Sequence, residues 1–457
     1  MDQHQHERWT TWPHAEALIQ EHLDQFLAIH ERARRLAADM ERYTSTRLFD
    51  WLDHLILSGD RRLIAWICAA GYVSEAAETG ASITLFRHPG AQLPRLALRP
   101  GGSEPDVLAI AIKVDSIAGF LLAHGIQAPV QGSVLSPYRI ATLWPEAGRV
   151  VLAVERRGYR GLVPQRRPIE DVRRYLTARE RWATRPRRTD DAQHGLKQTL
   201  ELARDLVREV GRDTAAWIVF EVERDYWQRR NWAGRLQKAR QDQLGLGWAN
   251  HDHHTFRSSR STFTTLVAVM ETLGFVCRER YYAGDEAGWG AQVMEQPHCG
   301  LVAFLDVDLL PHETAVDFAH ESLPETDQLG TVGLWCALHG ESILGAGMHH
   351  LEAQFDFDRL RADLASFGID TMKPFSDSHH LRQAFTRGER WAVDPARLAL
   401  LHVGGRITEE QYQTFLTNGA IGSHLENLQR REGYKGFNQH NVSSIIKETD
   451  PRRQLAG

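Results

Sequence analysis

Three short segments in the second half of the chain carry residues of the types that bind metals. They are the run HDHH at residues 251–254, the pair HH at residues 349 and 350, and the segment GSHLENL, which holds Glu426. Imidazole nitrogens and carboxylate oxygens together form the mononuclear sites of many metalloenzymes. Taken singly, each segment also fits a polar strand end, a structural histidine or an ion-paired glutamate.

The alternation of side chains along a strand divides these histidines between two faces. In the first segment, His253 shares a face with Arg257, and a guanidinium beside a metal-bound imidazole would favour an anionic, chelating ligand. In the second segment, His349 lies on the apolar face and His350 on the polar face. His350 is therefore the better ligand, and His349 the better structural residue.

Two histidines and one carboxylate on three strands leave coordination positions open, as in the non-haem iron(II) oxygenases. A closed structural zinc site would need a fourth ligand, commonly cysteine. The four cysteines are far apart and form no C-x-x-C pair: Cys68, Cys277, Cys299 and Cys336. The combination of His253, His350 and Glu426 therefore indicates an open, catalytic type of site.

The elements that would hold these residues alternate between strands and helices after residue 247. The expected strands are WANHDHHTFRSS, GWGAQVME, LVAFLDVDL, AGMHHLEAQF and a late one near GSHLENL, and the expected helices are STFTTLVAVMETLGF, TVGLWCALHG and FDRLRADLASFG. In the first half of the chain, one amphipathic helix over residues 13 to about 43 precedes two βαβββ-like units in tandem. Residues 190–245 are helical by spacing.

Between residues 156 and 190, the chain carries twelve arginines and has prolines at 164, 168 and 186. This composition predicts a domain boundary with a solvated, arginine-rich connector. The alternative is a nucleic-acid patch, which the acidic interruptions and the overall net charge of -5 disfavour.

The bulk composition is that of a soluble folded protein, with 42% hydrophobic and 25% charged residues. A chain of 457 residues is expected to form at least two domains. The N-terminus has no signal pattern, and no segment approaches the roughly 20 apolar residues of a membrane span. A cytoplasmic protein without nucleic-acid or membrane partners is therefore expected.

Residues from about 248 to 450 resemble the 2-oxoadipate dioxygenase/decarboxylase (hydroxyglutarate synthase) family of the vicinal oxygen chelate, or glyoxalase-like, superfamily. The resemblance lies in DHHTFRSSRSTFTTLVAVMETLGFV, LWCALHGESILGAGMHHLEAQFDFDRLRADLASFGI and GSHLENLQRREGYKGFNQHNVSSIIKETDP. It implies metal ligands at His253, His350 and Glu426 and a substrate-carboxylate role for Arg257. The sequence departs from the family pattern at His349 and at FLDVDL, where the substrate side chain could differ.

The resemblance also implies the architecture, an α+β fold of tandem βαβββ modules with added helices and a C-terminal cupped sheet that holds one metal ion. Residues 1–185 would form a degenerate module pair with the N-terminal helix and the connector, 186–246 a helical linker region, and 247–457 the catalytic domain. In the first pair, His54 and Glu155 stand at ligand-like positions. Ala109 at the third position cannot coordinate, so this half is expected to be metal-free.

The function implied by the resemblance is iron(II)-dependent oxidation of a 2-oxo acid such as 2-oxoadipate, with dioxygen, to a hydroxy acid one carbon shorter. Two alternatives remain open. A glyoxalase-like isomerase or lyase would use a divalent metal without dioxygen, and a binding protein for small molecules would need no metal.

Overall fold

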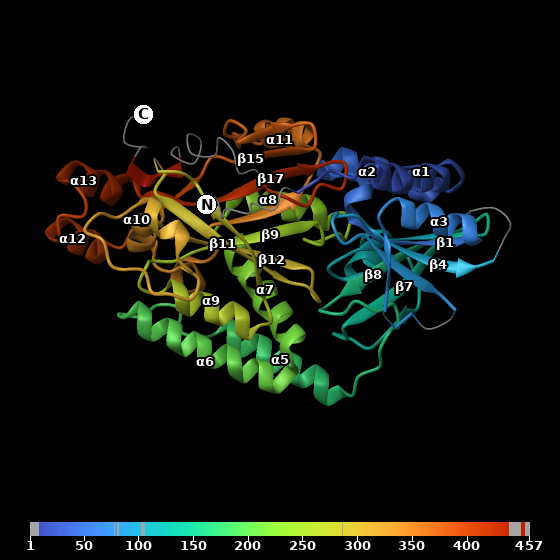
Figure 1. Ribbon diagram of the computed structural model, residues 1–457, viewed down its shortest axis with the longest axis horizontal. Coiled ribbons are helices and arrows are strands. Elements are labelled where there is room, and N and C mark those ends of the chain that lie inside the picture. The colour runs from blue at the N-terminus through green and yellow to red at the C-terminus, as the bar shows by residue number, and fades with distance from the viewer. Residues whose placement is uncertain are drawn as a thin grey trace.

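The structure is a computed structural model, which describes residues 9–76, 78, 79, 82–101, 106–285, 287–437 and 449–452. Two mixed β-sheets lie side by side, one from each half of the chain (Figure 1). Each sheet is built from two consecutive βαβββ units, so the predicted α+β class with tandem modules is confirmed. The proposed division at residues 185 and 246 stays a prediction.

The N-terminal sheet has the strand order β2-β3-β4-β1-β5-β8-β7-β6. Its two modules meet where β1 and β5 pair antiparallel. The short strands β2 and β6 were not expected from the sequence. The first module contains β1 (Leu52–Gly59), α3 (Arg61–Ala69), β2 (Val73–Glu75), β3 (Thr84–Arg87) and β4 (Arg95–Pro100), and the second contains β5 (Asp106–Lys113), α4 (Ile117–Ala123), β6 (Val130–Gln131), β7 (Tyr138–Glu146) and β8 (Arg149–Arg156).

The C-terminal sheet repeats this plan with the order β10-β11-β12-β9-β13-β17-β15-β14, and β16 pairs with β17. Its first module contains β9 (His251–Arg257), α9 (Phe263–Thr272), β10 (Val276–Tyr282), β11 (Trp289–Gln296) and β12 (Leu301–Asp308). The second contains β13 (His350–Gln354), α11 (Phe357–Ser366), β14 (Ser376–Ser378), β15 (Leu381–Phe385), β16 (Glu389–Trp391) and β17 (Ala420–Arg430). Helix α10 (Thr331–His339) joins the modules, and α12 (Pro395–Val403) and α13 (Glu409–Asn418), which the sequence analysis missed, precede β17.

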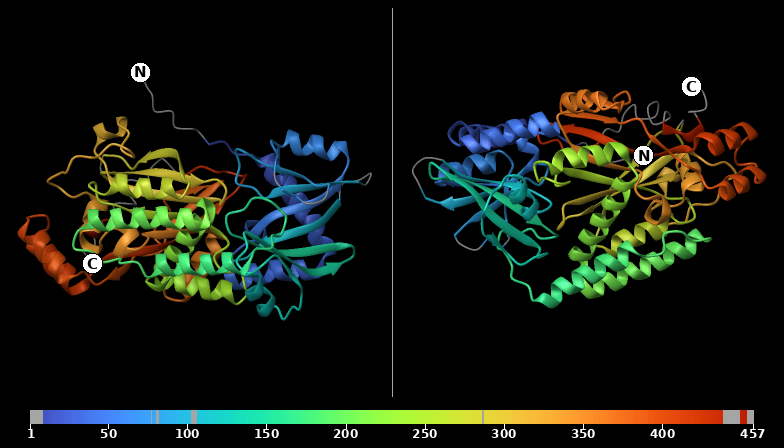
Figure 2. Two further views of the ribbon diagram at one scale, coloured as in Figure 1. Left: turned by 90° about the horizontal axis from the view of Figure 1, so that it is seen from below. Right: turned by 180° about the vertical axis from the view of Figure 1, so that it is seen from behind.

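A layer of helices covers the outer face of the C-terminal sheet and leaves its inner face for the candidate site (Figures 1 and 2). The layer consists of α5 (Ile169–Ala183), α6 (Ala192–Val210), α7 (Arg212–Arg229) and α8 (Trp232–Asp242). The apolar side chains of α5 to α7 share one buried core with α9 and with strands β9, β12 and β13. No helix in the part of the chain that the structure describes is long and apolar enough to cross a membrane.

The helix expected over residues 13 to about 43 is broken into α1 (Pro13–Ile29) and α2 (Glu31–Thr44). His30 causes the break, because its backbone is extended and its Nδ1 accepts the N–H of Ala33 as a helix cap. Its Nε2 donates to the carbonyl of Trp144 over 2.9 Å. A buried contact with a distant strand thus overrides helical spacing.

The arginine-rich segment is partly solvated, as its composition predicted, but it also packs on the helical layer. Much of it forms α5, and Arg185 and Arg187 beyond that helix bind the buried carboxylate of Glu223 on α7, at 2.9 and 2.8 Å. Burial raises the pKa of Glu223, but these two arginines outweigh that effect and hold the pKa below its ordinary value. The segment therefore docks on the helical layer through charge-assisted hydrogen bonds.

Candidate metal centre

Three neighbouring strands bring His253, His350 and Glu426 together on the inner face of the C-terminal sheet. β9 pairs antiparallel with β13, which pairs parallel with β17. The Nε2 atoms of His253 and His350 lie 3.8 and 3.0 Å from Oε2 of Glu426. All three ligand atoms fall within 4.8 Å of one another, so the group has the size to hold a metal ion.

The electrostatics of this group suit a cation. The three residues are only 3%, 7% and 2% exposed, in the order His253, His350 and Glu426. Burial lowers the pKa of both histidines well below the usual value, which leaves neutral imidazoles with available lone pairs. Burial, together with Asp252, raises the pKa of Glu426 well above its usual value. A divalent cation bound to these residues would offset the free-energy cost of burying the carboxylate. Two nitrogen donors and one oxygen donor with open coordination positions are a ligand set that suits iron(II).

His254 points away from the group, as strand alternation predicted, whereas His349 does not follow the prediction. His254 faces the helical layer, where its ring lies 4.8 Å from that of Phe220 and its Nε2 lies 3.2 Å from Nη1 of Arg224. His349 was expected on the apolar face with Leu351 and Ala353, but it precedes the first residue of β13, so strand alternation does not orient it. It packs edge-on against Trp335, in a cluster that also holds Phe385 beside His350, and its Nδ1 lies 3.0 Å from Nδ1 of His350. Neither His254 nor His349 joins the group of three.

Two further polar residues belong to the group, and the sequence analysis gave them no role. A carboxylate oxygen of Glu352 contacts Nδ1 of His253. Gln383 on β15 donates from Nε2 to Oε1 of Glu352 over 2.9 Å and to Oε1 of Glu426 over 3.3 Å. A carboxylate at Nδ1 fixes the tautomer that leaves Nε2 free for a metal. The signal for Glu352 was present, because it lies two positions after His350 on the same strand face.

Arg257 lies next to the group with donors to spare. Its side chain is 2% exposed, and neither Nε nor Nη1 has a hydrogen-bond partner in the described part of the chain. The nearest carboxylate is Asp306 of the FLDVDL segment, at 3.8 Å. Burial raises the pKa of Asp306 to about 7, against the opposing effect of Arg257. A buried guanidinium with unfilled donors is suited to receive an anion.

The corresponding residues of the N-terminal sheet are engaged differently. Nδ1 of His54 lies 2.6 Å from the carboxylate of Asp53. The carboxylate of Glu155 accepts hydrogen bonds from Arg139, Arg157 and the backbone N–H of Ile117. Ala109, which stands at the third position, is buried and offers no ligand atom. The oxygens of Glu155 are thus already committed to cations and a helix terminus.

No family model matches the chain, and no curated protein matches it. Among solved structures, a mutant of 4-hydroxymandelate synthase from Streptomyces coelicolor is 12% identical with a TM-score of 0.29, over 88% of this chain and 98% of that one. A fusion of a xylose isomerase-like TIM barrel with 4-hydroxyphenylpyruvate dioxygenase is 12% identical with a TM-score of 0.24, over 89% of this chain and 52% of that one. Methylmalonyl-CoA epimerase from Mycobacterium tuberculosis is 13% identical with a TM-score of 0.22, over 40% of this chain and 89% of that one. Scores this low carry no argument, so the fold rests on the strand topology above.

We predict that Ala substitution of His253, His350 or Glu426 abolishes stoichiometric metal binding while the protein stays folded, because each removes one of three ligand atoms. Metal analysis after reconstitution, with circular dichroism as the test of folding, measures this. The matched controls His254→Ala and His349→Ala should retain one equivalent of metal. Loss of metal from the controls alone would show that the strand faces are wrongly assigned.

We further predict that Glu352→Gln weakens metal affinity by about 10–100-fold, because the amide no longer holds the proton on Nδ1 of His253 in place. Competition with a chromophoric chelator measures the affinity. Glu410→Gln, on the exposed side of α13, is the matched control and should bind metal like the parent. An unchanged affinity in Glu352→Gln would contradict the orienting role.

Proposed function

We propose that the protein is a non-haem iron(II) dioxygenase and decarboxylase that acts on a 2-oxo acid. The observation that carries this proposal is the open group of His253, His350 and Glu426 beside the unsatisfied guanidinium of Arg257. The three sequence blocks that resemble the 2-oxoadipate family support the same assignment. 2-Oxoadipate is therefore the first compound to test.

The proposed ligands are His253, His350 and Glu426. Iron(II) held by them would supply Lewis acidity and an electron donor for dioxygen, with coordination positions left for a chelating 2-oxo acid. Arg257 binds a substrate carboxylate through its free donors, which favours an acid over a neutral aldehyde. An enzyme of the same fold that acts on an uncharged substrate would not need a cation at this position.

Aromatic rings around the histidines keep the reacting groups away from bulk water. Phe304 and Phe437 lie 4.4 and 5.1 Å from the ring of His253, and Phe385 lies 5.0 Å from that of His350, all measured between ring centroids. In such a dry environment, the pairing of Arg257 with a carboxylate gains strength. Water exclusion also limits side reactions of an oxidising centre.

With iron(II) and a suitable 2-oxo acid, we expect one dioxygen to be consumed for each carbon dioxide released. The product would be a hydroxy acid one carbon shorter, which accounts for both oxygen atoms. An oxygen electrode and product analysis by mass spectrometry measure the ratio. Turnover that continues without dioxygen would instead favour a glyoxalase-like isomerase or lyase, and a purified protein that binds no metal would favour a binding protein.

Arg257→Ala should lower kcat/KM by a factor equivalent to about 1.5–3 kcal/mol, the usual range for a hydrogen bond to a charged group. Steady-state kinetics on the preferred acid measures it. Arg280→Ala, at an exposed ion pair with Asp317, is the control and should leave kcat/KM unchanged. A variant of Arg257 as efficient as the parent on every acid would refute the carboxylate role.

The KM for an acid substrate should rise as the pH increases through about 7, where Asp306 ionises. Protonated Asp306 leaves the charge of Arg257 available, whereas ionised Asp306 neutralises it in competition with the substrate. The carboxylate of Asp308 also acts on Arg257, whereas Tyr281 near Asp306 stays a neutral phenol because burial raises its pKa. A pH profile of KM in parent and Asp306→Asn tests this, since the variant should lack the rise.

A further inference from the structure

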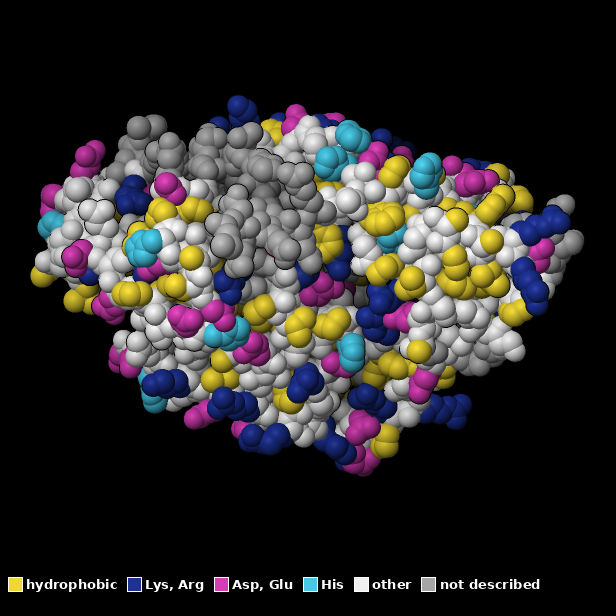
Figure 3. Space-filling model, in the orientation of Figure 1, with side chains coloured by type: hydrophobic (Ala, Val, Ile, Leu, Met, Phe, Trp, Pro, Cys, Tyr) yellow, Lys and Arg dark blue, Asp and Glu magenta, His cyan; other side chains and the backbone are white. Residues whose placement is uncertain are grey.

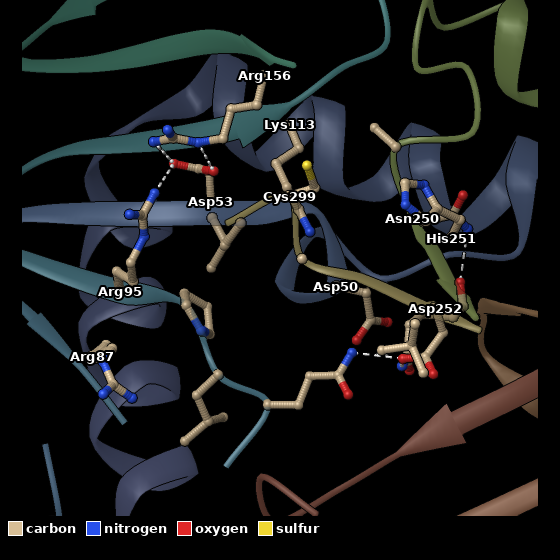
Figure 4. Close-up of a pocket in the computed structure, with 18 of the residues that line it drawn as sticks. Asp50, Asp53, Arg87, Arg95, Lys113, Arg156, Asn250, His251, Asp252 and Cys299 are labelled. Carbon is tan, nitrogen blue, oxygen red and sulfur yellow. Dashed lines mark hydrogen bonds and ion pairs between the residues drawn. The ribbon is translucent and has the colours of Figure 1, made fainter. Parts of the chain in front are cut away.

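A cavity of about 550 Å³ lies between the two halves of the chain, outside the candidate metal centre. Strands β1, β5 and β8 contribute to one wall, and the start of β9 with the end of β17 contributes to the other. Figure 4 shows charged side chains from both halves converging on this space. Its volume is within the range of sites for small ligands.

Four of the carboxylates in the cavity wall are paired with cations. Asp53 accepts hydrogen bonds from Arg156 at 2.5 and 2.8 Å and lies 3.4 Å from Arg95. Asp50 is paired with Arg47, which stands outside the lining. Asp252 is paired with Arg430 and accepts hydrogen bonds from the carboxamides of Gln92 and Gln354. Glu295 is paired with Arg278 and Lys435. Glu16 and Asp115, which also line the cavity, accept the backbone N–H groups of Gly433 and Trp248. Among the described residues, none of these six acids forms an ion pair with Lys113.

Lys113 supplies that further cation. It is the last residue of β5, and its side chain extends into the cavity (Figure 4). Within the described ranges, its ammonium makes neither a hydrogen bond nor an ion pair with any side chain. Burial lowers its pKa, even though Asp53, Asp252 and Asp50 act in the opposite direction. An anion beside the ammonium would offset this desolvation.

We propose that the cavity is a second ligand site, which binds a small anion through a carboxylate or phosphate group held by Lys113. The guanidinium groups of Arg95 and Arg156 lie on the same side of the cavity as Lys113, in a cluster where Asp53 neutralises only part of the charge (Figure 4). Across the molecular surface, Lys and Arg side chains also appear along the junction of the two halves (Figure 3). The field around the cavity therefore attracts anions.

The site is separate from the candidate metal centre. The ion pair of Asp252 with Arg430 and the ring of Phe437 line the cavity, and Phe437 also packs on His253. These residues form a wall between the two spaces.

The test is isothermal titration calorimetry of the full-length protein with inorganic phosphate and with glutarate, at low ionic strength. We expect saturable binding of at least one of them, weakened on the order of tenfold or more in Lys113→Met by the loss of a charged hydrogen bond. Lys197→Met, on the exposed side of α6, removes the same charge elsewhere and should bind like the parent. A preference for phosphate or for glutarate distinguishes the two sources of negative charge.

Arg257→Ala separates this site from the substrate site, because it should retain the binding that Lys113→Met loses. Labelling provides a second measurement: the aldehyde of pyridoxal phosphate forms an imine with a lysine amine, with loss of water, and borohydride reduces it. Peptide mapping should find the label on Lys113, with protection by the anion that binds. Absence of saturable binding in the parent, unchanged binding in Lys113→Met, or loss of binding in Arg257→Ala would each overturn the proposal.

Discussion

The central constraint in this structure is the burial of a carboxylate between two imidazoles. Glu426 lies on a strand in the middle of the C-terminal sheet, and each neighbouring element limits the water that can reach it. An uncompensated carboxylate there is unfavourable, which its raised pKa reflects. Neutral His253 and His350 cannot neutralise it, and Gln383 offers only one N–H group in a long contact. A divalent cation bound among these three residues would offset this cost, which is the basis of the proposed metal site.

Most of the fold could be predicted because the βαβββ units alternate between strong strand and helix patterns. The first module pair emerged from hydrophobic periodicity alone, apart from β2 and β6, which are too short to give a pattern. The misjudged elements depend on distant contacts. His30 interrupts a helical pattern because it is held by Trp144, and the arginines after α5 are buried only because Glu223 lies opposite. These partners are distant in the chain, so the local sequence pattern cannot predict the contacts.

The candidate site was predictable to the extent that strand alternation could select side chains. It assigned His253 and His350 to the inner face and His254 to the outer one, where His254 contacts α7. It misplaced His349, which packs on Trp335 next to His350. It could not reveal Gln383, which comes from β15 and reaches the group only across the sheet. Nor could it show that Asp306 is the sole carboxylate within ion-pair distance of Arg257 among the described residues, because β12 and β9 are distant in sequence.

The two halves share one strand topology but surround the corresponding glutamates with different charges. In the C-terminal cup, burial keeps the histidines neutral and leaves a carboxylate in need of a cation. In the N-terminal half, Glu155 at the corresponding strand position is bound by two arginines. Lys113 at the end of β5 faces the cavity and forms no ion pair with any residue that the structure describes. The arginines of the N-terminal half change the kind of ligand that is favoured. A cavity whose acids are paired and which also holds the Lys113 ammonium attracts an anion instead of a metal ion. A module pair without three metal ligands can therefore still bind a ligand, as proposed for the cavity beside Lys113.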